Sequence, residues 1–198
     1  MAKILYQGHA SLRITTDEGK VIYVDPYVGD GYDLPADLIL VTHQHSDHND
    51  LNLIKSKNAD CAVITEKEAL KAGEYQTFDY GYVTVEAVKA SNKNHDSDNC
   101  VGYIITLSGN KQIYISGDTS KTEIMETLAE RKLEYAFICC DGVYNMDIEE
   151  ASECASLIAA KHTIPYHMSP GELFNRQRAE LFKANGLLII ADSETFEI

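Results

Sequence analysis

Five side chains that could bind a metal crowd into the run THQHSDHND, which spans residues 42–50. His43 and His45 lie two positions apart, so in extended backbone both point to the same side. Asp47 and His48 are adjacent, so a turn can aim them away from the first pair. This spacing suits two neighbouring metal ions better than one. Imidazole and carboxylate ligands favour Zn²⁺, with Mn²⁺, Fe²⁺ or Ni²⁺ as alternatives.

An apolar strand followed directly by His or Asp recurs along the chain. VIYV ends before Asp25, VTVEAVKA leads to His95, KQIYIS is followed by Gly117-Asp118, and HTIPY ends before His167. Ligands in open α/β sheets collect beyond the carboxyl ends of the strands, so we expect these residues to converge. The expected ligands of a first metal are His43, His45 and His95, those of a second are Asp47, His48 and His167, and Asp118 bridges the two.

Two such ions, about 3.5–4 Å apart, can hold a bridging water as hydroxide near neutral pH, so no serine or cysteine nucleophile is needed. Asp118 would fix the separation of the metals, and Asp47 could orient the hydroxide or accept its proton. The chain contains no G-x-S-x-G, H-E-x-x-H or G-x-x-x-x-G-K-[ST] motif. These patterns predict metal-dependent hydrolysis with Asp47 and Asp118 as the catalytic carboxylates.

The segments that must position these residues follow a regular order along the chain. A series of strands comes first, strands alternating with helices follow, and this order occurs about twice. Strands are predicted in KILYQG, ASLRITT, KVIYVDPY, ADLILVT, CAVIT, QTFDYG, VTVEAVKA, VGYIITL, KQIYIS, YAFICC, HTIPY, LLIIA and TFEI. ADLILVT is a continuous apolar run, which is typical of a strand buried on both faces. The mixture predicts α/β layers with the sheets at the centre.

Capping residues predict where helices begin. Three pairs have a cap followed by Glu at the third position after it: Ser120 with Glu123, Asp147 with Glu150, and Ser169 with Glu172. The first of these helices would run to about Lys132, and Gly186 would end the last one. Asp50 is expected to open a helix over NDLNLIKSK and therefore to stay outside the metal site.

The run T-H-Q-H-S-D-H resembles the H-x-H-x-D-H signature of the metallo-β-lactamase superfamily, and Asp118 and His167 follow in its order. GHASLRI, VDPY, NKNHDSDNCVGYII, IYISGDT, YNMDIEEA and IPYH resemble a small prokaryotic branch of metal-dependent hydrolases. That branch is similar to L-ascorbate-6-phosphate lactonases and to N-acylphosphatidylethanolamine phospholipase D. The resemblance covers nearly the whole chain. It implies one domain over residues 1–198, a four-layer αββα sandwich with a two-metal site at the edge between the sheets.

Four more residues are expected near the metals. The resemblance implies that Asp25 is a carboxylate behind a ligating imidazole, where it fixes the tautomer of the ring. His9 follows a strand and is expected to support a ligand or to contact substrate, and Tyr144 and Asp141 could face the pocket. Cys139-Cys140-Asp141 stands where relatives often carry a Pro and glycines, and the two thiols are interpreted as buried and structural. His162, near a helix end, is interpreted as an ordinary surface or core histidine.

The composition limits the partners. The 198-residue chain has a formal net charge of −14, which repels polyanions, so nucleic acid is not an expected partner. Its five cysteines form no C-x-x-C pair and fit a reducing compartment. It shows neither a signal-peptide core nor a membrane-spanning run, so we expect a cytoplasmic protein that does not use a membrane. The sequence leaves a homo-oligomer open.

The leading hypothesis is therefore a two-metal hydrolase of a small ester, lactone, amide or phosphodiester. An anionic substrate would bind through the metals despite the acidic chain. The alternatives are a metal-dependent nuclease acting on RNA and a metal-binding protein without turnover. A di-iron redox enzyme is disfavoured, because di-iron relatives carry a Glu where this chain has Ser46.

Overall fold

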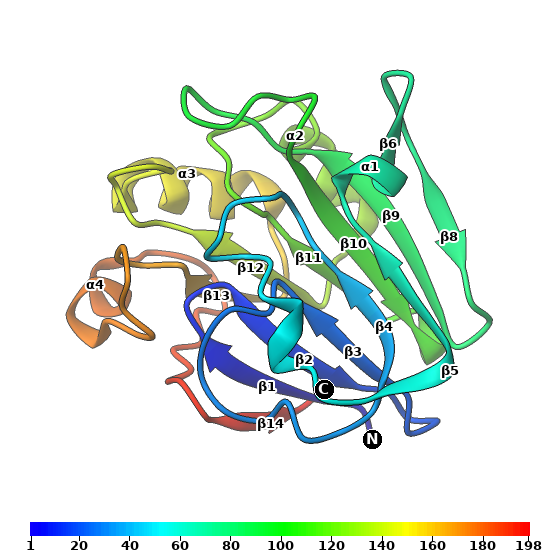
Figure 1. Ribbon diagram of the computed structural model, residues 1–198. Helices are drawn as coiled ribbons and strands as arrows, with labels where there is room; N and C mark the ends of the chain where they lie inside the picture. Colours follow the sequence, from blue (N-terminus) through cyan, green and yellow to red (C-terminus); the bar gives the residue numbers. More distant parts are fainter.

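Two six-stranded sheets pack face to face at the centre of the computed structural model, which describes residues 1–198 (Figure 1). The order of the first sheet is β14 (Thr195–Glu197), β1 (Lys3–Gly8), β2 (Ser11–Thr15), β3 (Val21–Val24), β4 (Ala36–Leu40) and β5 (Lys57–Ile64). The order of the second sheet is β13 (His162–Tyr166), β12 (Tyr135–Cys139), β11 (Gln112–Ile115), β10 (Val101–Leu107), β9 (Val83–Lys89) and β8 (Thr77–Asp79). A small hairpin of β6 (Leu70–Lys71) and β7 (Glu74–Tyr75) stands apart.

The two sheets repeat one pattern of strand directions. In the first sheet β1, β2 and β3 pair antiparallel, and β4 and β5 are then added parallel to β3. In the second sheet β9, β10 and β11 pair antiparallel, and β12 and β13 are added parallel to β11. The carboxyl ends of β3, β4, β11, β12 and β13 therefore lie along corresponding edges of the two sheets.

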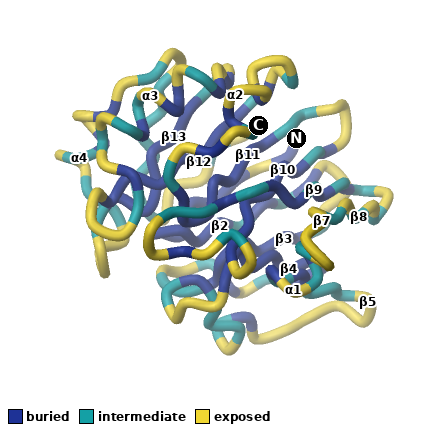
Figure 2. The backbone as a smooth tube through the Cα atoms, turned by 90° about the horizontal axis from the view of Figure 1, so that it is seen from above, coloured by how far each residue is buried: buried dark blue, intermediate teal, exposed yellow.

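The main core lies between the sheets, where the buried strands of both meet (Figure 2). As predicted, β4 is buried on both faces. Leu38 and Leu40 belong to the main core, whereas Ile39 and Val41 belong to a smaller cluster on the outer side of the first sheet. Tyr32 and Ile54, from connecting segments, close that smaller cluster. This continuous burial holds the residues that directly follow β4 in a rigid frame.

The helices are few and short. α2 (Met125–Leu128) and α3 (Ile148–Ile158) contact each other, and α3 packs on β12, so both cover the outer face of the second sheet (Figure 1). α1 (Glu66–Ala69) follows β5, and α4 (Arg176–Leu181) lies beyond β13. The layered α/β architecture agrees with the expectation, although a 3-10 turn and loops replace a long helix over the first sheet. None of the helices is long and apolar enough to cross a lipid bilayer.

The capping residues predicted one helix start correctly. The Asp147 carboxylate accepts from the N–H of Glu150 and opens α3 as expected. The helix predicted from Ser120 begins only at Met125, and no side chain caps it, but it continues as the 3-10 helix Ala129–Arg131 and so ends about where predicted. Glu123 instead pairs with Lys89 on the neighbouring strand. A capping pair in the sequence therefore does not establish a helix start where other residues of the fold bind the capping side chains.

The helices predicted from Ser169 and from Asp50 were wrong in position or extent. The chain after Ser169 makes turns, and α4 begins later, with Asn175 as its cap. α4 ends at Leu181, so Gly186 ends no helix. Asp50 caps only the 3-10 turn Leu51–Leu53, because the chain is already extended at Ile54. The predicted strand LLIIA makes only an isolated bridge, from Leu187 to Thr163.

Candidate metal centre

The carboxyl ends of strands from both sheets meet at one edge of the sandwich. His9 follows β1, Asp25 follows β3, Asp118 lies just after β11, and His167 follows β13. Hydrogen bonds join the two sheets here: the N–H of His167 donates to the carbonyl of His9 at 2.8 Å, and Val101 N–H donates to Thr42 O at 3.0 Å. The structure therefore brings all seven predicted ligands to one place, although their metal-binding role stays a prediction.

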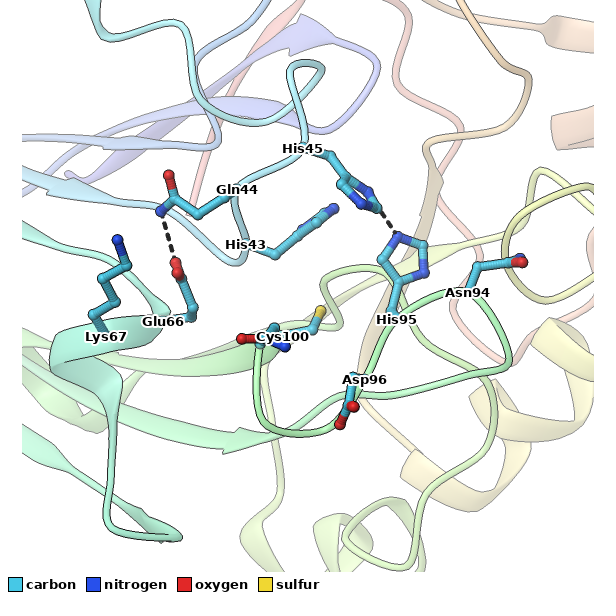
Figure 3. Close-up of a pocket in the computed structure, with 10 residues that line it drawn as sticks. His43, Gln44, His45, Glu66, Lys67, Asn94, His95, Asp96 and Cys100 are labelled. Carbon is cyan, nitrogen blue, oxygen red and sulfur yellow. Dashed lines mark hydrogen bonds between the residues drawn. The ribbon is translucent and has the colours of Figure 1, made fainter.

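The first group consists of His43, His45 and His95, whose ligand atoms lie within 4.8 Å of one another. Nδ1 of His45 and Nε2 of His95 are 3.1 Å apart and face each other (Figure 3). His43 and His95 are buried, whereas His45 is exposed. Three nitrogens that converge from two loops are a suitable ligand set for one divalent ion.

The second group consists of Asp47, His48 and His167, together with His9. The Oδ2 atom of Asp47 lies 3.8 Å from Nε2 of His167 and 3.3 Å from Nε2 of His9. The histidine side chains are almost completely buried, but the Asp47 side chain is 36% exposed. Asp47 is therefore the member of the group through which the site opens to solvent.

Asp118 lies between the two groups and turns one carboxylate oxygen toward each. Its Oδ2 is 3.3 Å from Nε2 of His95 and 3.9 Å from Nε2 of His43. Its Oδ1 is 3.3 Å from Nε2 of His48 and 3.5 Å from Nε2 of His167. A carboxylate in this position can serve two cations at once.

Thr42 and Asp25 fix the rings of His43 and His48 from behind. The Thr42 hydroxyl donates to Oδ2 of Asp25 at 2.8 Å, so its lone pair accepts from Nδ1 of His43 at 3.0 Å. Nδ1 of His48 donates to the same Asp25 oxygen at 2.9 Å. Both rings therefore carry their hydrogen on Nδ1 and turn the lone pair of Nε2 into the site.

A second network fixes His95 and extends to Asp141 beside His167, and the sequence did not point to two of its members, Asn92 and Asn145. Asn92 Oδ1 accepts from Nδ1 of His95 at 2.9 Å, and its amide donates to Asn145 at 2.8 Å. Asn145 in turn donates at 2.7 Å to Oδ2 of Asp141, and this oxygen lies 3.4 Å from Nδ1 of His167. In the sequence, only the polar run NKNHDSDN indicated a functional role for Asn92, and no pattern indicated a role for Asn145.

Three residues of the site have left-handed backbone. The φ angles are 56° for His9, 45° for Asp25 and 45° for His167, and each residue directly follows a strand. Left-handed backbone is unfavourable for residues other than glycine and concentrates at functional sites. Here it turns each side chain inward at the point where the strand would otherwise continue.

The environment of the cluster favours the metal-binding forms of His43 and Asp118 but the protonated form of His48, so an ion that binds His48 must displace a proton. Burial, reinforced by His48, lowers the pKa of His43 to about 2. Burial opposes a charge on His48, but Asp118 and Asp25 outweigh it and raise its pKa to about 9. Burial would raise the pKa of Asp118, but the neighbouring histidines, His167 first, lower it well below its usual range. Neutral imidazoles and an ionised carboxylate are the forms that bind divalent ions.

Several inward-facing polar atoms have no hydrogen-bond partner. They are Nε2 of His43, Nε2 of His48, Nε2 of His167 and Oδ1 of Asp118, and all are buried. Buried polar atoms without partners are costly, and native proteins contain few of them. Divalent ions would bind these atoms directly, so the residues present fit the expected metals.

A cleft of about 380 Å³ opens at the exposed side of this cluster, with Tyr27, Tyr144 and Asn94 in its walls. Asp141 holds one wall: its Oδ1 accepts from the N–H groups of Val143 and Tyr144 at 2.6 and 2.7 Å. Asp141 thus connects the turn that carries Tyr144 to the ring of His167. Tyr144 lines the cleft as predicted, whereas Asp141 is buried behind it and does not line it, and contact with a substrate stays a prediction.

A second cavity, of about 410 Å³, lies on the other side of His43 and His45 (Figure 3). Its walls are polar, and Lys67 is their one cation. Gln44 donates to the buried carboxylate of Glu66 at 2.7 Å, which fixes both side chains in the wall. The two spaces share His45, Asn94 and His95.

Cys139 and Cys140 are not part of this chemistry. Cys139 and Cys140 are completely buried, and burial raises the pKa of both thiols, that of Cys140 to about 12. Thiols that stay protonated are poor nucleophiles and poor metal ligands. The interpretation of this pair as structural agrees with their burial.

Known proteins resemble this chain over most of its length. Residues 3–167 match the β-lactamase superfamily domain. A metal-dependent hydrolase of Thermoplasma acidophilum is 32% identical over 205 residues, covering 92% of this chain and 89% of that protein. A metal-dependent hydrolase of Flavobacterium johnsoniae is 30% identical over 227 residues, covering 99% and 100%. The crystal structure of a proposed metal-dependent hydrolase of Parabacteroides distasonis has a TM-score of 0.78 and 29% identity, covering 96% and 92%.

Proposed function

The chain belongs to the β-lactamase superfamily, and we propose that it is a two-metal hydrolase of a small ester, lactone, amide or phosphodiester. Its membership among metal-dependent hydrolases makes it an enzyme that uses metal. The number of metals, the roles of the residues and the class of substrate are our proposals. We treat residues 1–198 as one catalytic domain.

The position of Asp118 carries this proposal. Its two oxygens face two different groups of histidines, so one carboxylate can neutralise two cations and hold them at a constant separation. A single-metal site would leave either His43 or both His48 and His167 with buried ring nitrogens that have no partner. The donor atoms are nitrogen and carboxylate oxygen, which favours Zn²⁺ in both positions.

In this proposal His43, His45 and His95 would hold the first ion, Asp47, His48 and His167 would hold the second, and Asp118 would serve both. When bound, the ions would lower the pKa of water and polarise the bond to be broken. Before any ion arrives, His43 is neutral and Asp118 is ionised, whereas His48 must release a proton when an ion binds. Thr42, Asp25 and Asn92 hold the rings, so little reorganisation accompanies the reaction.

Asp47 has a further role that its exposure supports. It is the acidic side chain that reaches both the second group and the cleft, whereas Asp118 is only 4% exposed. The neighbouring histidines, beginning with His9, outweigh burial and lower the pKa of Asp47, so the carboxylate stays ionised near neutral pH. We propose that it accepts a hydrogen bond from the attacking water and orients it toward the substrate.

The walls of the cleft favour a small substrate with an apolar or aromatic part. Tyr27 and Tyr144 flank the opening, and no Lys or Arg is among the lining residues. An extended RNA would require a basic surface, which an acidic chain with a net charge of −14 does not favour. The five unpaired cysteines fit a reducing compartment such as the cytoplasm.

Metal content and turnover test the proposal together. The wild type, His48→Ala and a control, His162→Ala, are analysed by plasma mass spectrometry and assayed on lactones, thioesters and phosphodiesters. His162 lies at the start of β13 against Tyr135, outside the cluster. We expect two ions in the wild type and control, and one ion with loss of turnover in His48→Ala. A folded wild type with one ion or none and no metal-dependent turnover would contradict the proposal.

A further inference from the structure

The ring of His9 lies inside the second metal group, although the H-x-H-x-D-H run does not include it. Its Nε2 is 3.3 Å from Oδ2 of Asp47, and its ring centroid is 3.9 Å from that of His167. The ligand atoms of His9, Asp47, His48 and His167 all lie within 4.8 Å of one another. The His9 side chain is only 1% exposed, so bulk water does not reach it.

The tautomer of His9 follows from its other nitrogen. Nδ1 lies 3.2 Å from the carbonyl oxygen of Glu172, and a carbonyl oxygen only accepts hydrogen bonds. Nδ1 must therefore carry the hydrogen, which leaves a lone pair on Nε2 in the neutral ring. This lone pair faces the carboxylate of Asp47, whose oxygens are also acceptors. The 3.3 Å contact therefore requires either a second proton on the His9 ring, so that Nε2 donates to Asp47, or a bound cation near both atoms.

His9 thus has the same arrangement as the histidines already assigned to the metals. His43, His48 and His95 each point Nδ1 at an oxygen outside the cluster and Nε2 into it. We propose that His9 is a further ligand of the second metal, bound through Nε2 beside Asp47, His48 and His167. The proposal rests on the two-metal function proposed above and adds a ligand from the first sheet to that site.

The backbone around His9 supports this role. Its φ of 56° is left-handed, which for a non-glycine residue costs about 1–2 kcal/mol. Three hydrogen bonds hold this conformation: His9 N–H donates to Leu173 O at 2.7 Å, and the His9 carbonyl accepts from Tyr6 Oη at 2.9 Å and from His167 N at 2.8 Å. The same bonds that turn the ring inward therefore also join His9 to the ligand His167.

Counting the histidines on each metal tests the proposal without measuring activity. The protein is labelled with ¹⁵N-histidine, loaded with ¹¹³Cd²⁺, and examined for ¹¹³Cd–¹⁵N couplings. We expect six of the seven histidines to be coupled, three to each cadmium, and His162 to be uncoupled. Two bound cadmium ions with five coupled histidines and a proton on Nε2 of His9 would overturn the proposal but not the two-metal site. Fewer than two bound ions would overturn both.

A substitution of His9 can remove the imidazole ring without disturbing the left-handed backbone. His9→Asn is preferable to alanine, because asparagine tolerates left-handed backbone better than other residues with a Cβ. We expect the affinity of the second metal to fall roughly 100-fold or more, beyond the 10–100-fold typical of losing a group behind a ligand. His162→Asn should change neither affinity. An unchanged second affinity in folded His9→Asn would overturn the proposal.

Discussion

Thr42 donates twice to Asp25, from its backbone N–H at 2.7 Å and from its hydroxyl at 2.8 Å. The hydroxyl then accepts from Nδ1 of His43, and the same carboxylate accepts from Nδ1 of His48. Thr42 and Asp25, which are not among the proposed ligands, therefore orient one histidine in each group. Substitutions of Thr42 and Asp25 can therefore change the metal affinity of one proposed site more than that of the other.

Thr42→Val keeps the shape of the side chain and removes the hydroxyl that holds His43. We expect the affinity of the first metal to fall about 10–100-fold. The Asp25 carboxylate also loses a buried donor, which should lower the free energy of unfolding by about 1–3 kcal/mol. Thr42→Ser retains the hydroxyl and should behave like the wild type. Competition with a chelating dye measures both affinities, and equal values for Val and Ser would contradict this role.

Asp25→Asn removes a charge behind His48 while tolerating the left-handed backbone at this position. We expect the second metal to bind about 10–100-fold more weakly. In the metal-free protein, Asp118 and Asp25 together raise the pKa of His48 to about 9, so this pKa should be lower in the variant. A histidine NMR titration measures it. An unchanged His48 pKa would show that Asp118 acts alone.

Asp37 stabilises the first sheet far from the metals. It accepts from Lys20 Nζ, from Val21 N–H and from Asn58 Nδ2, each at 2.9 Å. Burial would raise its pKa, but these donors outweigh it and lower the pKa below the ordinary 3.8. A lowered folded-state pKa stabilises the fold above the unfolded pKa, and this stability disappears as the pH falls through the folded value.

Asp37→Asn should therefore lower Tm at pH 7 by roughly 2–8 °C, as expected for a loss of about 1–2 kcal/mol in a domain of this size. The difference from the wild type should shrink below about pH 4. Scanning calorimetry across pH measures this dependence. Asp60→Asn, an exposed carboxyl on β5, is the control and should show no such trend. A Tm difference independent of pH would contradict the role of the ionised carboxylate.

Tyr144→Ala removes an aromatic wall of the cleft from a side chain that is 53% exposed. We expect KM to rise about 3–30-fold for substrates with an apolar part, because the lost contact is worth about 1–2 kcal/mol. Tm should change little, since exposed side chains contribute little to stability. Tyr75→Ala, on the separate hairpin, is the matched control. Steady-state kinetics that leave KM unchanged would place the substrate elsewhere.

Lys67 is the one cation in the walls of the second cavity. If the substrate extends there with a negative group, Lys67→Gln should raise KM for anionic substrates roughly 3–10-fold and leave neutral ones unchanged. The effect should weaken at high salt. Lys71→Gln makes the same charge change at an exposed position outside the cavity. An equal effect on anionic and neutral substrates, or in the control, would argue against an anion subsite.

The strands and the positions of the expected ligands could be predicted from the sequence, because apolar runs and the polar residues after them are local patterns. The strand through ADLILVT and its two buried faces are an example. Helix starts failed where tertiary contacts took the capping side chain, as at Glu123. Asn145 was missed because its function exists only through Asn92 and Asp141, which are brought to it by the fold. The inward direction of His9 depends on its backbone angle, which its residue type does not show.

The hydrogen bond between His167 N–H and the His9 carbonyl joins distant parts of the chain, which has a consequence for biosynthesis. During translation His43, His45 and His95 become available while the second sheet is still incomplete. The second site must wait until β13 emerges and docks beside the end of β1. We therefore expect the proposed second site to be complete only after synthesis passes residue 167. Such an order would make loading of the second site a late maturation step.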